Sequence, residues 1–438
     1  MFKNPVLLKR FEAIFVRLSL FHLSSALLPL VLSGGISEGD GVDISSIDLS
    51  LIAKINLLIY VVAFALLVLR WKKALNFASK NFLYWLFVIF ASFSYFWSSM
   101  PETTFKGVVY GLGTTIFGIY LASRYTIKEQ LNHVAWTLGL IITLSVLFAV
   151  ALPHYGLMGG VHEGAVRGIY IHKNVFSPII VLSVVVFFLQ AFDTKQNKWL
   201  LWGFFATSIA LGIMSRSSTA LGLMILMLLI CSCCYVLRWR YEVLISAILL
   251  ILIVGTFGLL WFVQFGGAEL LFDAVGKDIT LSRRTEIWSY VWDSIQEKPW
   301  LGYGLSGYWN GLNGPSAYVQ RAMRVKVHYA HNGFLDICLN FGFVGLSLFV
   351  SHFLFVTKKS LLFLRQSIDG AGIWPLVSLI YIIFTNLTEG NLAALNSLSW
   401  VLYTTVTFSL LRNSFPRDFT SSSHRREQIL NDSRKQWV

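Results

Sequence analysis

Four side chains in this sequence have the type and the setting to hold an anionic group. Arg216 lies in the tight turn between two apolar runs. Arg283 and Arg284 begin a predicted helix, and His331 directly precedes a further apolar run. A guanidinium group grips phosphate oxygens through paired N–H donors, and an imidazole exchanges a proton near neutral pH. These residues therefore predict a site for a phosphate-bearing group.

Each arginine also has a simpler interpretation. Arg283 and Arg284 lie at a helix N-terminus, where the macrodipole disfavours positive charge. An oxyanion bound between the guanidiniums and the free N–H groups would remove this conflict. The alternative is a pair of solvated arginines. For Arg216, the alternative to an anionic partner is a helix-end side chain whose charge reaches the headgroup region.

The acids and histidines near these positions complete the list of candidates. His331 can act as a base or donate to a phosphate, and the sequence does not choose. Asp336 is expected to pair with His331 or to line a cavity. Glu389, near the outer end of an apolar run, has no obvious partner, and the cost of membrane charge makes it a candidate. His328 shares a face with His331, but no third ligand follows, so neither a metal nor a cofactor is expected.

Glycine and aromatic residues alternate in two neighbouring segments, 299–304 and 308–311. Such loops suit sugar rings, whose C–H faces stack on aromatic planes. They also form the aromatic belts of membrane interfaces. Both interpretations remain open for Trp300 and Tyr303, which are therefore candidate substrate-binding residues.

The elements that must position these side chains are membrane helices. Of 438 residues, 56% are hydrophobic and 13% are charged, against about 25% charged in soluble domains. This composition excludes a water-soluble domain and predicts an all-α, polytopic integral membrane protein. The formal net charge of +13 follows from basic cytoplasmic loops, so no nucleic-acid partner is expected.

Apolar runs long enough to cross about 30 Å of hydrocarbon predict about twelve membrane-spanning helices. Residues 1–265 hold the first nine, 266–331 form a large outer loop, 332–412 hold the last three, and 413–438 form a basic cytoplasmic tail. The runs lie at 13–33, 50–69, 82–98, 104–123, 133–152, 174–192, 198–214, 217–237, 242–265, 332–356, 373–391 and 393–412.

Positive charges orient these runs. With both termini in the cytoplasm, the inner segments hold 22 of the 35 basic residues, whereas the outer loop 34–49 holds none. Arg167, Lys173 and Arg216 then lie outside, against the trend. In the large outer loop, a helix is expected over 282–297, with Ser282 as its N-cap. Its apolar stripe marks a face packed on the membrane domain or lying at the interface; the stripe consists of Ile287, Val291 and Ile295.

Four features resemble the O-antigen ligase and polysaccharide polymerase superfamily of bacterial membrane glycosyltransferases. Residues 214–219 are similar to its Ser/Thr-Arg turn between two spans. Residues 282–288 and 299–304 resemble its Arg-x-x-x-Trp helix and the Pro-x-Leu-Gly-x-Gly that follows. His331 and Asn332, a nine-residue spacer and the Gly-x-x-Gly of 342–345 resemble its most specific signature. The fourth feature is the topology, with a large outer loop between late spans.

The resemblance assigns the family's essential arginines to Arg216 and Arg284 and its essential histidine to His331. Arg283 is an extra neighbour without an assigned role. The segment 167–174 looks like the His-Lys-Asn segment of exopolysaccharide polymerases in this superfamily. It adds four candidate substrate-binding residues: Arg167, His172, Lys173 and Asn174.

The resemblance implies metal-independent glycan transfer at the outer face of the bacterial plasma membrane. The implied donor is a glycan on polyprenyl diphosphate, such as undecaprenyl diphosphate, and the acceptor is a saccharide or a lipid-linked group within the membrane. Segment 167–174 favours a polymerase over a ligase. A transporter or flippase of lipid-linked sugars is the alternative from another class, but the repeated halves expected of one are not evident.

Overall fold

The computed structural model describes eight stretches of the chain, and its helices confirm the all-α fold class. Apart from one isolated β-bridge between Leu157 and Val166, the described residues form helices, turns and loops. The acidic part of loop 34–49, residues 266–282 and the tail 413–438 lie outside the described residues. The described residues are 5–36, 48–194, 196–237, 241–264, 283–324, 326–367, 369–390 and 395–412.

Each of the twelve predicted apolar runs corresponds to a helix. Six described helices are long and apolar enough to cross a membrane, or seven if one bent pair counts as a span. The chain is therefore a polytopic membrane protein, and the count of twelve spans stays a prediction. The main helices are α1 (Pro5–Leu23), α3 (Ser50–Val68), α5 (Phe82–Phe93), α6 (Pro101–Arg124), α7 (Ile127–Ala151), α9 (Lys173–Asp193), α10 (Lys198–Met214), α11 (Ser218–Leu237), α12 (Tyr241–Gln264), α16 (Gly333–Gln366), α17 (Trp374–Thr388) and α18 (Leu398–Arg412).

The first predicted run, 13–33, is wrong as a single helix. α1 begins at Pro5 and ends at Leu23, and the short α2 (Leu28–Leu32) follows. Ser25 and Leu27 adopt positive φ angles of 61° and 60°, which a helix cannot continue through. The sequence signal was continuous because the residues at the break are themselves apolar or small.

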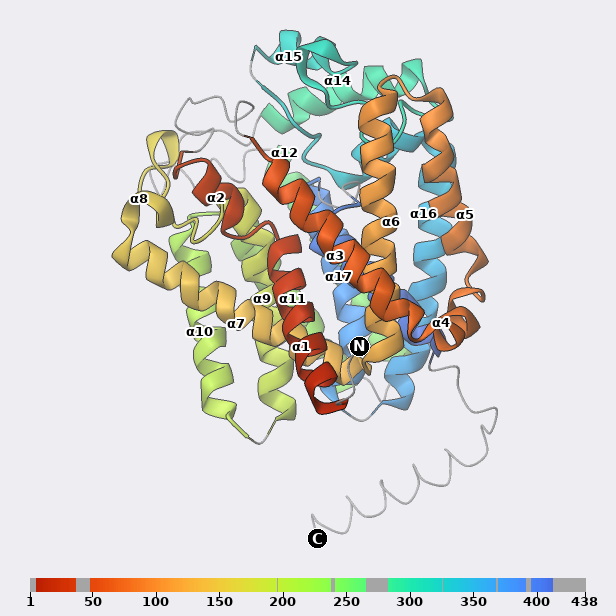
Figure 1. The fold of residues 1–438 in the computed structure, drawn as a ribbon. Coiled ribbons are helices and arrows are strands. Elements are labelled where there is room, and N and C mark those ends of the chain that lie inside the picture. Colours follow the sequence, from red (N-terminus) through yellow and green to blue (C-terminus); the bar gives the residue numbers. More distant parts are fainter. Residues whose placement is uncertain are drawn as a thin grey trace.

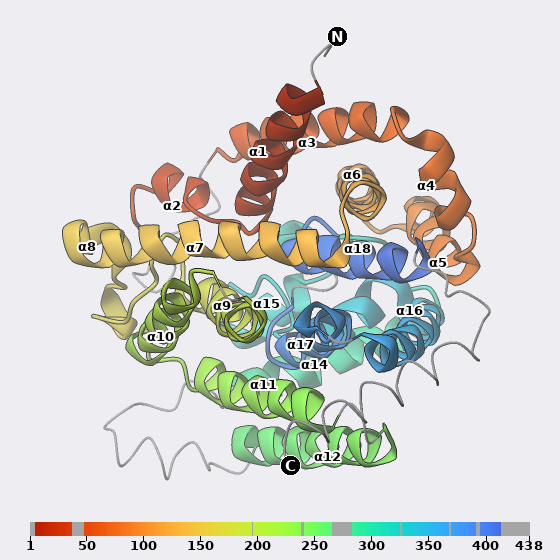
Figure 2. The same ribbon diagram turned by 90° about the horizontal axis from the view of Figure 1, so that it is seen from below.

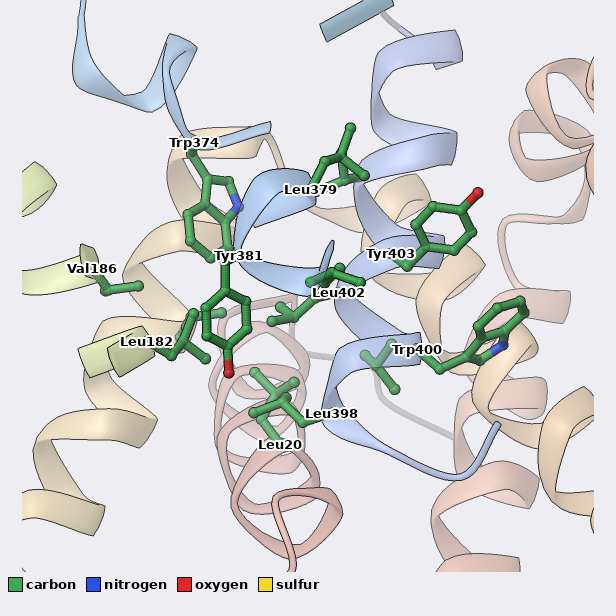
Figure 3. Close-up of a cluster of buried hydrophobic side chains, with 14 of the residues drawn as sticks. Leu20, Leu182, Val186, Trp374, Leu379, Tyr381, Leu398, Trp400, Leu402 and Tyr403 are labelled. Carbon is green, nitrogen blue, oxygen red and sulfur yellow. The ribbon is translucent and has the colours of Figure 1, made fainter. Parts of the chain in front are cut away.

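The core of the bundle is built around α9, α17 and α18. Seen from the end opposite α14 (Arg283–Glu297), α17 lies among α11, α16 and α18 (Figure 2). Figure 3 shows Trp374 and Tyr381 of α17 beside Leu182 of α9 and Leu402 of α18. The Tyr381 hydroxyl donates to the Pro178 carbonyl at 2.9 Å, so this packing also satisfies a carbonyl on α9. α9 is thus a central helix rather than a lipid-facing one.

The described part of the predicted outer loop forms a small helical cap at one end of the bundle (Figure 1). It contains α14 and α15 (Ala317–Met323). The apolar stripe of α14 is buried, with Ile287, Val291 and Ile295 exposed by 6%, 0% and 1%. These side chains pack with Tyr308 and Val319 in a second hydrophobic cluster, which confirms that the stripe is a packed face.

The cap contacts the membrane helices at a break in α16. Gly342 has φ 62° and ψ −168°, which interrupts the helical hydrogen bonds. The segment 299–304 fills the gap, and a Cβ on Gly342 would lie 2.3 Å from the Trp300 carbonyl. Four backbone hydrogen bonds join segment 299–304 to α16: Tyr303 N to Leu339 O (2.8 Å), Gly304 N to Asn340 O (2.9 Å), Phe343 N to Pro299 O (2.7 Å) and Val344 N to Trp300 O (3.3 Å). The Pro-x-Leu-Gly-x-Gly and Gly-x-x-Gly segments are therefore two sides of one contact.

Candidate functional site

Glu389 lies between the two side chains on which the sequence analysis centres. Its Oε1 is 3.0 Å from Arg284 Nη2, and its Oε2 is 3.4 Å from His331 Nδ1. The Tyr329 hydroxyl also donates to Oε2 at 3.2 Å. The three partners come from α14 and from the segment that enters α16, so Glu389 joins the cap to the end of α17. The expectation that Glu389 has no obvious partner is wrong.

The carboxylate of Glu389 lies in a nearly closed setting. The residue is 6% exposed and follows the last residue of α17, outside the helix. Burial by itself raises the pKa of a carboxyl, but the contacts with His331 and Arg284 outweigh it and hold the pKa of Glu389 below its usual value.

Arg284 reaches this cluster from the first turn of α14. The side chain is 13% exposed, and its partner Glu389 supplies the negative charge that the helix N-terminus favours. The repulsion expected between the Arg284 charge and the positive end of the helix dipole is thus offset by Glu389, a residue of the protein itself. The side chain of Arg283 lies outside what the structure describes.

His331 is held in a strained turn by its neighbours. It adopts φ 52°, a left-handed conformation that is uncommon for a side chain other than glycine. The preceding residue, Ala330, is fully buried, and its carbonyl accepts from Trp288 Nε1 at 2.9 Å. Asn332 then caps α16 by accepting from Phe334 N at 3.0 Å. The turn therefore fixes the imidazole at the mouth of α16.

Asp336 holds this turn, and no ion pair among the described residues joins it to His331, so that expected pairing is not observed. Its Oδ1 accepts from Ala330 N at 3.1 Å and from Trp309 Nε1 at 2.7 Å. The residue is 3% exposed, and its Oδ2 is buried without a hydrogen-bond partner. A Cβ on Gly390 would lie 2.4 Å from that oxygen, so the backbone next to Glu389 packs directly on Asp336.

Arg216 lies in another part of the same end of the molecule. It occupies the turn between α10 and α11 with φ 50°, and its Nη1 donates to the Glu163 carbonyl at 3.2 Å. Its guanidinium also approaches Gly164. Both contacts are in the segment that follows α8 (Pro153–Gly156), which Figure 1 draws toward the same end as α14. The side chain is exposed, unlike that of Arg284.

Arg167 does not present its charge to the outside, contrary to its expected role in substrate binding. The residue is 1% exposed. Its guanidinium donates to four backbone carbonyls, those of Tyr155 (2.8 Å), His154 (2.9 Å), Ile171 (3.3 Å) and Gly35. Because the bonds span three segments, Arg167 shapes the loop from which Glu163 contacts Arg216.

The following residues of segment 167–174 begin α9. His172 is the N-cap, and its Nδ1 accepts from Asn174 N at 3.1 Å. Lys173 is 8% exposed and Asn174 is half-buried. These positions give local structural roles to His172 and Asn174, and substrate contact stays a prediction for all three.

The glycine and aromatic segment divides into a buried and an exposed part. Tyr303 is 4% exposed, and its hydroxyl donates to Ser294 O at 2.8 Å and to Glu297 Oε2 at 2.9 Å. It is a packing residue, so the prediction of a sugar platform at Tyr303 is not supported by its burial. Trp300 is 68% exposed and keeps both interpretations, an interfacial residue or a sugar contact.

Three residues of the site were not singled out from the sequence. Tyr329 contacts Glu389, and its ring centroid lies 4.2 Å from that of His331. Trp288 and Trp309 fix the turn at Ala330. All three are aromatic residues with a polar atom, in or near the segments that carry the other candidates. Among the described residues, no group of three His, Cys, Asp or Glu side chains is placed to hold a metal ion.

Comparisons with known proteins show what parts of the chain are similar to. The O-antigen ligase family model matches residues 203–350, which include Arg216, Arg284, His331 and the break in α16. The match covers 148 of the 438 residues, and this part of the chain is similar to the O-antigen ligase family. The chain is also similar to the exopolysaccharide production protein ExoQ of Rhizobium meliloti (strain 1021), with 23% identity over 292 residues. That match covers 65% of this chain and 66% of the relative, just under two thirds of its length.

The matched segment contains part of the cluster. Arg284 and His331 lie within the matched domain, whereas Glu389 lies beyond its last residue, 350. The domain's arginine and histidine are thus brought together by a carboxylate from a later helix end. The candidate site is therefore complete only when α17 packs on α16.

Proposed function

We propose that this protein is a metal-independent glycosyltransferase that acts at the outer face of the bacterial plasma membrane. Its donor would be a polyprenyl-diphosphate-linked glycan. The observation that carries the proposal is the cluster of Arg284, Glu389 and His331 at the cap-facing end of the bundle. It combines a fork of N–H donors for phosphate with an imidazole for proton transfer.

The reaction joins an acceptor hydroxyl to the sugar carried by the lipid. The acceptor oxygen attacks the anomeric carbon, the bond from that carbon to the diphosphate oxygen breaks, and lipid diphosphate leaves with the electron pair. The hydroxyl proton passes to a base. Negative charge gathers on the leaving diphosphate, so fixed cations aimed at it lower the barrier, by about 3 kcal/mol for one donor in comparable sites.

Glu389 suits His331 to the role of base. In this proposal the imidazole carries its proton on Nδ1, which lies 3.4 Å from the carboxylate, and Nε2 accepts the proton of the acceptor. Glu389 then stabilises the imidazolium that forms. Donation from His331 to the diphosphate is the second possible role, and it uses the same orientation.

The diphosphate is assigned to Arg284 and Arg216. One guanidinium nitrogen of Arg284, Nη2, donates to Glu389. The other N–H donors of the guanidinium group can bind phosphate oxygens. Arg216 is exposed at the same end of the molecule and extends the positive charge toward the segment after α8. The guanidiniums supply the charge that a divalent ion provides in other phosphate chemistry, which supports metal-independent transfer.

Polymerisation of exopolysaccharide or O-antigen units is the activity favoured here. Similarity to an exopolysaccharide production protein supports it, whereas the family description, O-antigen ligase, supports transfer of finished glycan to lipid A-core or another acceptor. The glycan profile of a deletion strain separates them. Loss of a polymerase leaves single units on lipid, and loss of a ligase leaves long lipid-linked chains.

A donor-cleavage assay on purified protein in detergent tests the enzyme class itself. No gradient exists across a micelle, so turnover there is chemical rather than transport. Release of lipid diphosphate in the presence of EDTA is the expected result. A protein that moves lipid-linked sugar across vesicles but never cleaves it would be a flippase instead.

A further inference from the structure

A basic cluster lies at the end of the bundle opposite the candidate site. α6 runs between the two ends: Gly107 near its start approaches Ser306 of the cap, and Arg124 is its last residue. Around Arg124 the structure gathers Arg70, Arg412 and Lys73, and all three arginines interact electrostatically with the Lys73 ammonium. Nothing in the proposed reaction uses this end of the molecule.

Two of these arginines share one buried carboxylate. Glu12 of α1 is fully buried, with its Oε1 2.6 Å from Arg70 Nη2 and its Oε2 2.7 Å from Arg124 Nε. The side chains of the two arginines are 21% and 19% exposed. Glu12 therefore balances one of the two positive charges that it holds in place.

The third arginine caps a helix, and the lysine has no ion partner. Arg412 Nη1 donates to the carbonyls of Ala122 at 2.8 Å and Tyr125 at 3.0 Å, at the C-terminal end of α6. These carbonyls offer partial charge only. Lys73 is exposed, and no ion pair within the described part of the chain includes it. Among the described residues, four positive charges thus lie near two carboxylates, that of Glu12 and that of Glu129, which also interacts electrostatically with Arg124, so an excess of positive charge remains.

The lysine stands on a helix with the character of a membrane-surface helix. α4 (Trp71–Ala78) bends by 97° from the segment Phe82–Trp97 and packs on α6 and α18 (Figure 2). Its inner face buries Ala74 and Phe77, while Trp71 and Leu75 are 54% and 56% exposed. An apolar outer stripe beside a basic patch suits the boundary between acyl chains and headgroups.

We propose that this basic cluster binds the phosphate headgroup of an anionic phospholipid from the adjoining leaflet. The guanidiniums and Lys73 would contact the phosphate, and the exposed stripe of α4 would contact the acyl chains. The charge imbalance selects an anion, and the neighbouring apolar stripe selects a lipid over a soluble ion. The bound lipid would join α1, α4, α6 and α18 through one headgroup. This inference stands independently of the proposed glycosyl transfer.

Thermal unfolding of the full chain in neutral detergent tests the proposal. Dioleoylphosphatidylglycerol and dioleoylphosphatidylcholine are titrated in parallel, because a ligand that binds the folded state raises Tm saturably. We expect the saturable rise with phosphatidylglycerol and not with phosphatidylcholine. Lys73→Gln should raise the phosphatidylglycerol concentration that gives half of the Tm rise by about fivefold, the usual contribution of one lysine at an anionic surface.

Lys72→Gln is the matched control, because it removes the same charge from the same helix. Lys72 lies over the Trp71 ring, with Nζ 5.7 Å from the centroid. Its variant should keep the wild-type half-saturation point. Equal effects of the two lipids, or of the two variants, would overturn the proposal. An equal rise with inorganic phosphate at the same concentration would also overturn it, in favour of a soluble anion.

Discussion

Arg284 Nη2 lies 3.0 Å from Glu389 Oε1, and this ion pair links residues 105 positions apart in the chain. One partner belongs to the cap and the other follows a core helix, so the pair forms only in the assembled molecule. His331 meets the second oxygen of the same carboxylate. The relative placement of guanidinium and imidazole therefore depends on Glu389.

Replacement of Glu389 by Gln should reduce transfer strongly while preserving shape. The amide keeps an acceptor for Arg284 but loses the charge that orients and stabilises the His331 imidazole. We expect product formation to fall about 100-fold, as for other groups that position a catalytic residue. Glu286→Gln, on the exposed side of α14, is the control and should retain activity. Wild-type rates in Glu389→Gln would exclude this role.

Arg284 should not be replaceable by lysine. Lysine keeps the charge but lacks the planar fork that holds Glu389 and phosphate together. Arg284→Lys and Arg284→Ala are both expected to lose about 100-fold or more in donor cleavage, the cost of one electrostatic donor. Arg321→Ala, at an exposed position of α15, should behave as wild type. If Arg284→Lys retained full cleavage, charge alone would suffice.

Asp336 should contribute to stability as well as to activity. Asp336→Ala leaves Ala330 N and Trp309 Nε1 without their acceptor in a buried setting. We expect a loss of about 2–3 kcal/mol in unfolding free energy, together with reduced transfer, because the turn before His331 loosens. Asp293→Ala, which removes one exposed contact with Tyr318, should cost less than about 1 kcal/mol. Equal costs in unfolding experiments would show that Asp336 does not hold the turn.

The break in α16 should require glycine. A Cβ on Gly342 would overlap the Trp300 carbonyl, and its φ of 62° disfavours any other residue. Gly342→Ala is expected to destabilise the protein by about 2–4 kcal/mol and to loosen the cap. Gly222→Ala in α11 has open space around the new methyl group and should be neutral or stabilising. The measurement is the Tm of each variant in detergent. Equal Tm values for Gly342→Ala and Gly222→Ala would show that position 342 does not require glycine.

The sequence predicted the helices better than the contacts between them. Apolar runs located the twelve main helices because their signal is local, and the stripe Ile287, Val291 and Ile295 predicted a packed face that is buried. The break after α1 was missed because Ser25 and Leu27 carry no strong breaker signal. Local composition is sufficient for the helices of a membrane protein but not for their ends.

The site was predicted in its residues but not in its pairing. His331 and Arg284 were found because short motifs carry them, but their common partner Glu389 is distant in sequence. Arg167 looked like an outer cation, and only the folded loop reveals the four carbonyls that it holds. Tyr303 looked like a sugar contact because a buried tyrosine and an exposed one have the same local sequence.

The central claim is that the Arg284, Glu389 and His331 cluster transfers glycan from a lipid diphosphate. Its most direct test is the release of lipid diphosphate by purified protein in detergent with EDTA, measured for wild type, His331→Ala and Arg284→Ala at matched folded fractions. We expect turnover by wild type and loss of turnover in both variants. Undiminished release by both variants, or release that depends on an added divalent ion, would contradict it.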